Sequence, residues 1–202
     1  MRLIICAFFT YFCFSCERKA RDSVKTIEYY SSGKVKEIVF VKDGKRDGLD
    51  SVFYESGVLH SVQNFNNGLL EGKQIIYYNN GKIKDEVFYS NNKFNGPFKG
   101  FYINGSLKSE GLMRNGIETG QRKQYYSNGQ LRTISTLKNG LANGTIVEYY
   151  MSGKRMLNGT CRDDKIEGIV IFHDSISNDS AQLLFVNGHA IKKFNNLEPV
   201  KN

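Results

Sequence analysis

A period of 24 residues runs through most of this 202-residue chain, and it constrains the fold more than any other feature. Blocks written from Tyr29 align without a gap, and each of the first six carries a glycine at its fifth position. A fixed period in this range is typical of a repeat array, in which each unit buries its apolar side chains against its neighbours. We expect units at residues 29–52, 53–76, 77–100, 101–124, 125–148 and 149–172, a degenerate cap at 173–196 and a tail at 197–202.

Three columns of turn-forming residues divide each unit into strands. Ser-Gly or Asn-Gly pairs mark tight hairpin turns, because glycine adopts the positive φ that such turns need. The columns are Gly33, Gly57, Gly81, Gly105, Gly129 and Gly153; Asp43, Asn67, Asn91, Asn115, Asn139, Asp163 and Asn187; and Gly48, Gly72, Gly96, Gly120, Gly144 and Gly168. Each unit is predicted to be a strand, a tight turn, a strand and a longer glycine-containing loop.

The predicted fold is all-β, an elongated single antiparallel sheet of stacked β-hairpins. A composition of 20 Gly, 12 Tyr and 14 Phe against two Pro agrees with many short strands. Because each unit adds two strands about 4.8 Å apart, seven units would extend roughly 65–70 Å.

Alternation of side chains along the strands predicts a packed side and an opposite side. With a tight turn of two or four residues, Tyr30 lies opposite Val35 and Tyr29 opposite Lys36, whereas a three-residue loop would shift this register. The packed side is expected to hold Tyr30, Tyr54, Tyr78, Tyr102, Tyr126 and Tyr150, then Val35, Leu59, Ile83, Leu107 and Leu131, and then Val41, Phe65, Tyr89, Met113, Leu137, Cys161 and Phe185. Cys161 is interpreted as a buried apolar residue.

The N-terminal residues are typical of an export signal. Arg2 precedes an apolar run from Leu3 to Phe14, which is too short to span about 30 Å of hydrocarbon, so residues 1–15 are predicted to be a cleaved signal peptide. Ser15 and Cys16 resemble the end of a bacterial lipobox, which implies lipidation of Cys16 and a short tether at residues 16–23. An ordinary secretory signal is the alternative.

The repeat resembles a known family. The phrase Tyr-(Tyr/Phe)-x-x-Gly-(Lys/Gln/Ser)-(Val/Ile/Leu), followed by Asn-Gly and by a glycine after an acidic residue or Asn, is similar to the MORN repeat variant of bacterial exported and lipid-anchored proteins. The resemblance covers residues 24–196 and implies a ladder of β-hairpins. Some members are named antitoxin-like, and eukaryotic relatives are scaffolds or membrane-associated modules. The tryptophan that often stands in the unit's strand is absent here.

An aromatic and basic surface is the candidate ligand face. The expected register places Tyr29, Phe53, Tyr77, Phe101, Tyr125 and Tyr149 across from Lys36, His60, Lys84, Lys108, Arg132 and Met156. Cations about 9–10 Å apart with rings between them could bind a polyanion or a sugar chain. The alternative is that the lysine stems only cover exposed rings.

No catalytic or metal-binding pattern is found, so the chain is predicted to be non-enzymatic and without a cofactor. His60, His173 and His189 stand at different repeat phases and lack metal-ligand spacing. A formal charge of +8 favours an anionic or protein ligand in the bacterial envelope, where export argues against nucleic acid. Three roles stay open: a lipid-anchored binding scaffold, an antitoxin-like or immunity-like inhibitor, and a structural spacer. The sequence predicts neither the membrane face nor the oligomeric state.

Overall fold

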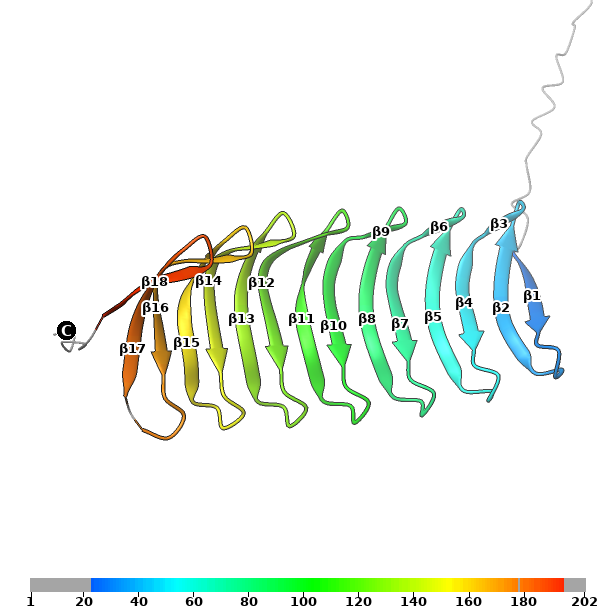
Figure 1. Ribbon diagram of the computed structural model, residues 1–202. Coiled ribbons are helices and arrows are strands. Elements are labelled where there is room, and N and C mark those ends of the chain that lie inside the picture. The colour runs from blue at the N-terminus through cyan, green and yellow to red at the C-terminus, as the bar shows by residue number, and fades with distance from the viewer. Residues whose placement is uncertain (1–22, 178, 195–202) are drawn as a thin grey trace, which may run out of the picture.

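The computed structural model describes residues 23–177 and 179–194, which form one antiparallel sheet of 18 strands. In Figure 1 the hairpins stand side by side along one axis, with the first at the blue end and the last at the red end. Each long strand is hydrogen-bonded to the long strands before and after it in the chain. The short strands β3 (Lys45–Arg46), β6 (Leu69–Leu70) and β9 (Lys93–Phe94) pair with the same partner as the strand that follows them, so the sheet is an open meander. The predicted all-β ladder is confirmed. None of the described residues forms a helix long and apolar enough to cross a membrane.

The strands repeat with the period of the sequence. The first ten are β1 (Val24–Tyr29), β2 (Val35–Lys42), β3 (Lys45–Arg46), β4 (Gly48–Phe53), β5 (Leu59–Asn66), β6 (Leu69–Leu70), β7 (Gly72–Tyr77), β8 (Ile83–Ser90), β9 (Lys93–Phe94) and β10 (Gly96–Phe101). The others are β11 (Leu107–Arg114), β12 (Ile117–Tyr125), β13 (Leu131–Lys138), β14 (Leu141–Tyr149), β15 (Arg155–Arg162), β16 (Lys165–His173), β17 (Ser180–Val186) and β18 (His189–Phe194).

The tight turn at one end of each hairpin has a three-residue loop. In the first unit the Gly33 amide donates to the Tyr30 carbonyl at 2.9 Å, and the Tyr30 amide donates to the Lys34 carbonyl at 2.8 Å. Gly33 has a φ of 80°, which completes a turn followed by a left-handed residue. Tyr29 therefore pairs with Val35, and Lys36 forms a one-residue bulge before Glu28 pairs with Glu37.

The other end of each hairpin is also a tight turn, so the expected longer loop is wrong. Lys42 pairs with Lys45, which leaves a two-residue turn in which Asp43 and Gly44 both have positive φ. The third glycine column lies inside the returning strand and forms a bulge there. At this bulge the Asp47 amide still donates to the Phe40 carbonyl at 2.8 Å, so the hydrogen-bonded ladder continues.

All eight of the most buried side chains in the described residues lie on one side of the sheet, which we call the packed face. Register and alternation place Val39, Leu137, Leu157, Cys161, Val170, Asp50, Ser61 and Thr133 there. The Val41 column and the second tyrosine of each unit also lie on this face, as expected. The Val35 column does not: the three-residue loop puts Val35 beside Tyr29 on the opposite side, which we call the outer face.

The second tyrosine of each unit joins that unit to the next. Tyr30, Tyr54, Tyr78, Tyr102, Tyr126 and Tyr150 donate from their hydroxyl groups to the carbonyls of Phe53, Tyr77, Phe101, Tyr125, Tyr149 and His173 at 2.6–3.0 Å. This tyrosine ladder runs the length of the array. It explains why this position is Tyr in all six units, whereas the first aromatic position accepts Phe.

Candidate functional site

A row of ring and cation pairs runs along the packed face. Lys84 Nζ lies 6.0 Å from the ring centre of Tyr78, Lys108 Nζ lies 5.8 Å from that of Tyr102, and the Arg132 guanidinium lies 5.8 Å from that of Tyr126. In the second unit the imidazole of His60 meets Tyr54 edge to face, with ring centres 4.7 Å apart. We call the three pairs formed by Lys84, Lys108 and Arg132 the tyrosine–cation row, and His60 stands at the equivalent place in the second unit.

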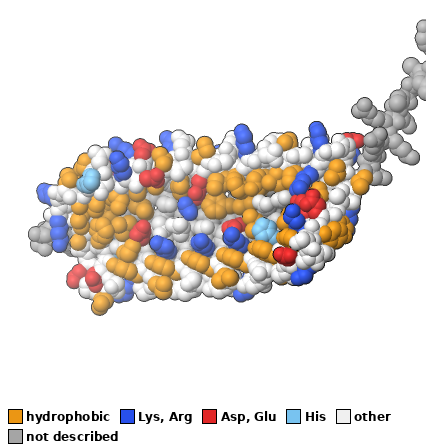
Figure 2. Space-filling view, turned by 45° about the vertical axis from the view of Figure 1, so that its right-hand side comes forward, with side chains coloured by type: hydrophobic (Ala, Val, Ile, Leu, Met, Phe, Trp, Pro, Cys, Tyr) orange, Lys and Arg blue, Asp and Glu red, His pale blue; other side chains and the backbone are white. Residues whose placement is uncertain are grey.

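The bulge next to the tight turn positions each cation of the row. Because Lys84 is the extra residue between the Ile83–Tyr77 pair and the Asp85–Ile76 pair, its side chain turns to the packed face and reaches Tyr78. The same register recurs around Lys108 and Arg132. Figure 2 shows Lys and Arg side chains in line with a histidine, between bands of hydrophobic side chains.

The three cations of the row are free to bind an external anion. Within the described residues no carboxylate lies at ion-pair distance from Lys84, Lys108 or Arg132, and all three are exposed. Lys36, the equivalent in the first unit, instead pairs with Glu28 at 3.8 Å. Since each unit adds two strands, neighbouring cations of the row lie about 10 Å apart.

The predicted pairing of the candidate ligand face is wrong. The first aromatic of each unit, Tyr29, Phe53, Tyr77, Phe101, Tyr125 and Tyr149, lies on the outer face opposite Val35, Leu59, Ile83, Leu107, Leu131 and Arg155. The cations predicted to face these rings lie on the packed face beside the other tyrosine. The structure therefore separates the predicted aromatic and basic columns onto opposite faces. The three cations of the row instead lie beside the second tyrosine of their units.

The outer face carries an alternating ladder of charges that the sequence did not suggest. Lys99 pairs in register with Glu86 on one side and Glu110 on the other, and Glu110 pairs with Lys123. Lys73 Nζ lies 2.8 Å from Glu86, and Lys123 Nζ lies 3.7 Å from Glu110. Opposite charges on adjacent strands stabilise their pairing. Lys73 and Lys123 of this face are thus already matched by carboxylates.

Tyr125 is held by the same ladder. Its hydroxyl donates to Glu110 Oε1 at 2.8 Å. Burial, together with the hydrogen bond to Glu110 and its charge, raises the pKa of Tyr125 to about 12. This candidate ligand residue is therefore part of a stabilising network.

A buried acidic residue lies near the N-terminal end of the packed face. Asp50 is 0% exposed and accepts a hydrogen bond from Arg46 Nη1 at 2.8 Å, and the same guanidinium pairs with Glu37 at 2.9 Å. Arg46 also lies over the ring of Phe65, 5.4 Å from its centre. Burial raises the pKa of Asp50, while the charge of Arg46 opposes the shift.

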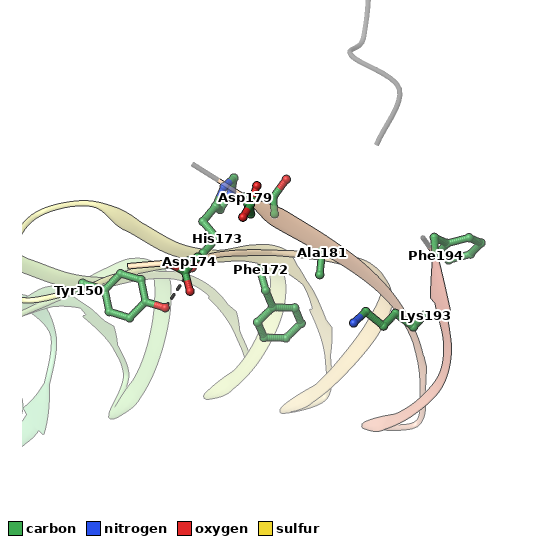
Figure 3. Close-up of a pocket in the computed structure, with 9 residues that line it drawn as sticks. Tyr150, Phe172, His173, Asp174, Asp179, Ala181, Lys193 and Phe194 are labelled. Carbon is green, nitrogen blue, oxygen red and sulfur yellow. Dashed lines mark hydrogen bonds between the residues drawn. The ribbon is translucent and has the colours of Figure 1, made fainter. Parts of the chain in front are cut away.

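A hollow of about 580 Å³ opens at the C-terminal end of the packed face. We call it the terminal hollow. Its lining includes the rings of Tyr150, Phe172 and Phe194, the ammonium-bearing side chain of Lys193, and the small residues Ser180 and Ala181. Figure 3 shows Lys193 extending toward Phe172, and the hydroxyl of Tyr150 bonded to the carbonyl of His173.

The remaining candidate groups do not converge. His60, His173 and His189 lie on β5, β16 and β18, and the part of the chain that the structure describes contains no group of three metal-ligating side chains. Cys161 is buried as predicted. Burial and the charges of Asp164 and Glu148 raise the pKa of its thiol, which disfavours the reactive thiolate. Cys16 and the predicted signal peptide lie outside the described residues.

The fold and the row define a class of protein: an open-sheet array of β-hairpins with repeated surface positions. The model of the MORN repeat variant matches residues 24–43, 70–91 and 118–139, and each match covers one hairpin closed by a three-residue turn. The chain is thus a MORN-variant repeat protein, as the sequence resemblance implied. The alternate hairpins have the same turn glycines and the same tyrosine hydrogen bonds. No curated protein sequence matches the chain.

Proposed function

We propose that this protein is a non-catalytic, lipid-anchored scaffold of the bacterial envelope that binds an extended anionic partner along the tyrosine–cation row. One observation carries the proposal: Lys84, Lys108 and Arg132 occupy the same place in three consecutive units and have no carboxylate partner among the described residues. The outer face contrasts with the row, because Lys73 and Lys123 are paired there with carboxylates.

The spacing of the row favours an elongated partner over a compact one. Three charges about 10 Å apart span about 20 Å, which a chain with repeated acidic groups can follow. Each cation rests against a ring, so it is held near one position before binding and loses less freedom when a partner arrives. Binding of this kind is electrostatic and should weaken as salt rises.

The binding test replaces the three cations together. Lys84→Glu, Lys108→Glu and Arg132→Glu should weaken binding to polygalacturonate and poly-L-glutamate at least about tenfold. A matched variant, Lys45→Glu with Lys93→Glu and Lys165→Glu, makes the same change in net charge at exposed turns of the outer face. Neutral dextran controls for non-ionic binding. Equal losses in both triple variants would show a general charge effect and refute the row.

The membrane part of the proposal rests on Cys16, which the lipobox resemblance selects. Cys16→Ser should abolish incorporation of a labelled fatty acid and move the protein from the membrane fraction to the soluble fraction. A variant that stays in the membrane fraction without the label would contradict lipid anchoring. The neighbouring substitution Cys13→Ser is the control, and it should leave the label in place.

A further inference from the structure

The terminal hollow lies where the array would hold a seventh ladder tyrosine. Asp174 follows Tyr150 by 24 residues and so stands at the tyrosine position. Ser180 stands at the position of Lys36, His60, Lys84, Lys108, Arg132 and Met156. In β17, however, Ser180 pairs directly with His173, without the bulge that turns Lys84 to the packed face, and the packed-face residue is Ala181 beside Phe172. The hollow lies where the ring of the missing tyrosine would be, next to this small residue.

The lining of the hollow corresponds to the surroundings of an interior ladder tyrosine. Within the array, each such ring lies near the residue at the Lys84 position and follows the tyrosine of the preceding unit. In the terminal hollow the preceding tyrosine is Tyr150, and the packed-face residue at this end of β17 is Ala181. Lys193 reaches the hollow from β18, which supplies a cation to replace the missing one. The hollow thus continues the interface between units.

The edge of the sheet beside the hollow is open to another strand. β18 pairs with β17 through residues such as Leu183 and Lys193, and no described strand pairs with its other edge. An unpaired edge presents backbone donors and acceptors that an extended segment can use. Because Lys193 and Phe194 belong to both β18 and the hollow lining, a strand added at this edge would bring a side chain to the hollow.

We propose that the terminal hollow binds a tyrosine side chain presented by an extended segment of another protein that pairs with the free edge of β18. The ring would pack against Tyr150 and Phe172, with the ammonium group of Lys193 near it. Asp174, at the mouth of the hollow, already accepts hydrogen bonds at Oδ1 from the amides of Ile176 and Ser177, so its Oδ2 would accept the hydrogen bond from the phenol. The site is separate from the tyrosine–cation row and does not depend on it.

The test uses a short acetylated and amidated peptide of alternating threonine and valine with one central tyrosine. Isothermal titration against the full chain should show binding at least about tenfold tighter than for the same peptide with alanine at the centre. Asp174→Tyr restores the repeat tyrosine and should abolish the preference. Ala181→Phe, which adds a ring beside Phe172 on the packed face, is the second blocking variant in case the first disturbs the loop.

A control substitution and two further measurements distinguish tyrosine capture in the hollow from general attraction to the chain. Glu55→Tyr makes the same loss of one acid and gain of one ring at an exposed turn, and it should leave the preference intact. Equal binding of the two peptides, or a preference that survives both blocking variants, would overturn the proposal. Binding of N-acetyltyrosinamide as tight as that of the peptide would overturn strand pairing. Self-association abolished by Asp174→Tyr would overturn the assignment to a foreign partner.

Discussion

At the scale of single residues, the two adjacent aromatic positions of each unit have different roles. Tyr78 donates from its hydroxyl to the carbonyl of Phe101 at 2.7 Å and lies under Lys84. Tyr77 lies on the outer face in a column that also contains Phe53 and Phe101. The hydroxyl therefore joins neighbouring units at one position, whereas the other position accepts phenylalanine.

Removing one hydroxyl of the tyrosine ladder should destabilise the protein. Tyr78→Phe leaves the Phe101 carbonyl without its side-chain donor, so we expect the free energy of unfolding to fall by about 1 kcal/mol. Tyr77→Phe is the matched control and should change it by less than about 0.5 kcal/mol. Urea unfolding followed by far-ultraviolet circular dichroism measures both. Equal effects of the two substitutions would contradict the distinction.

The buried carboxyl group of Asp50 should make stability depend on pH. Since its pKa in the folded state lies above the ordinary value of 3.8, the stability that this group contributes is present below that value. It is lost as pH rises through the folded-state pKa. The amide side chain that Asp50→Asn introduces does not titrate. The free energy of unfolding of the variant, measured relative to that of the native protein, should therefore rise between pH 3 and pH 7. A shift in favour of the native protein would contradict this sign.

At the scale of strands, glycine and aromatic residues compensate each other across neighbouring strands. Gly111 of β11 pairs with Phe98 of β10, and a Cβ atom added at Gly111 would lie 2.7 Å from the Phe98 ring. The other units carry Val39, Gln63, Val87, Ser135 and Gly159 at the equivalent place, and a Cβ atom added at Gly159 would likewise lie 2.8 Å from Val170. The space above Gly111 is therefore filled by the ring from the adjacent strand.

Gly111→Ala should be destabilising because the new methyl group meets the Phe98 ring. We expect a loss of about 1–3 kcal/mol in the free energy of unfolding, the usual cost of overpacking. Phe98→Leu in the same chain should recover part of the loss, because a smaller side chain leaves room for the methyl group. A double variant with the summed effect of the two single substitutions would show that Gly111 and Phe98 do not interact in this way.

The sequence predicted most of the strands and turns but not the register in which the strands pair. The period, the turn positions, the packed tyrosine column and the burial of Cys161 all follow from the spacing of glycine and aromatic residues. The face of Val35 does not, because it depends on loop length and on the bulge at Lys36. Glycine at the third loop position was a usable signal for a three-residue loop. The bulge had no comparable signal.

At the scale of the whole molecule, β1 and β18 are the outermost strands of the described array, and its units are in phase. Phe101 and Tyr125 are equivalent positions, so a chain that lacks residues 101–124 keeps its turns and its tyrosine ladder aligned. The terminal hollow was not predictable, because the loop between β16 and β17 departs from the repeat. A change at one end of the array need not disturb the other.

Deleting one whole unit should shorten the molecule without unfolding it. Loss of residues 101–124 removes two strands, so the longest dimension from small-angle scattering should fall by about 10 Å. A cooperative unfolding transition should persist. Deletion of residues 101–112 alone breaks the phase and is the control expected to lose that transition. If both deletions unfold the protein, the units are not interchangeable.

The row's role as a binding surface is tested most directly by photo-crosslinking in living cells. A photoreactive amino acid placed at Lys108, in the row, should give adducts with an acidic partner, and the same group at Lys93, on the outer face, should not. Salt added before irradiation should reduce the adducts at Lys108. Identical adducts from both positions, or none from Lys108 while Lys93 reacts, would contradict binding along the tyrosine–cation row.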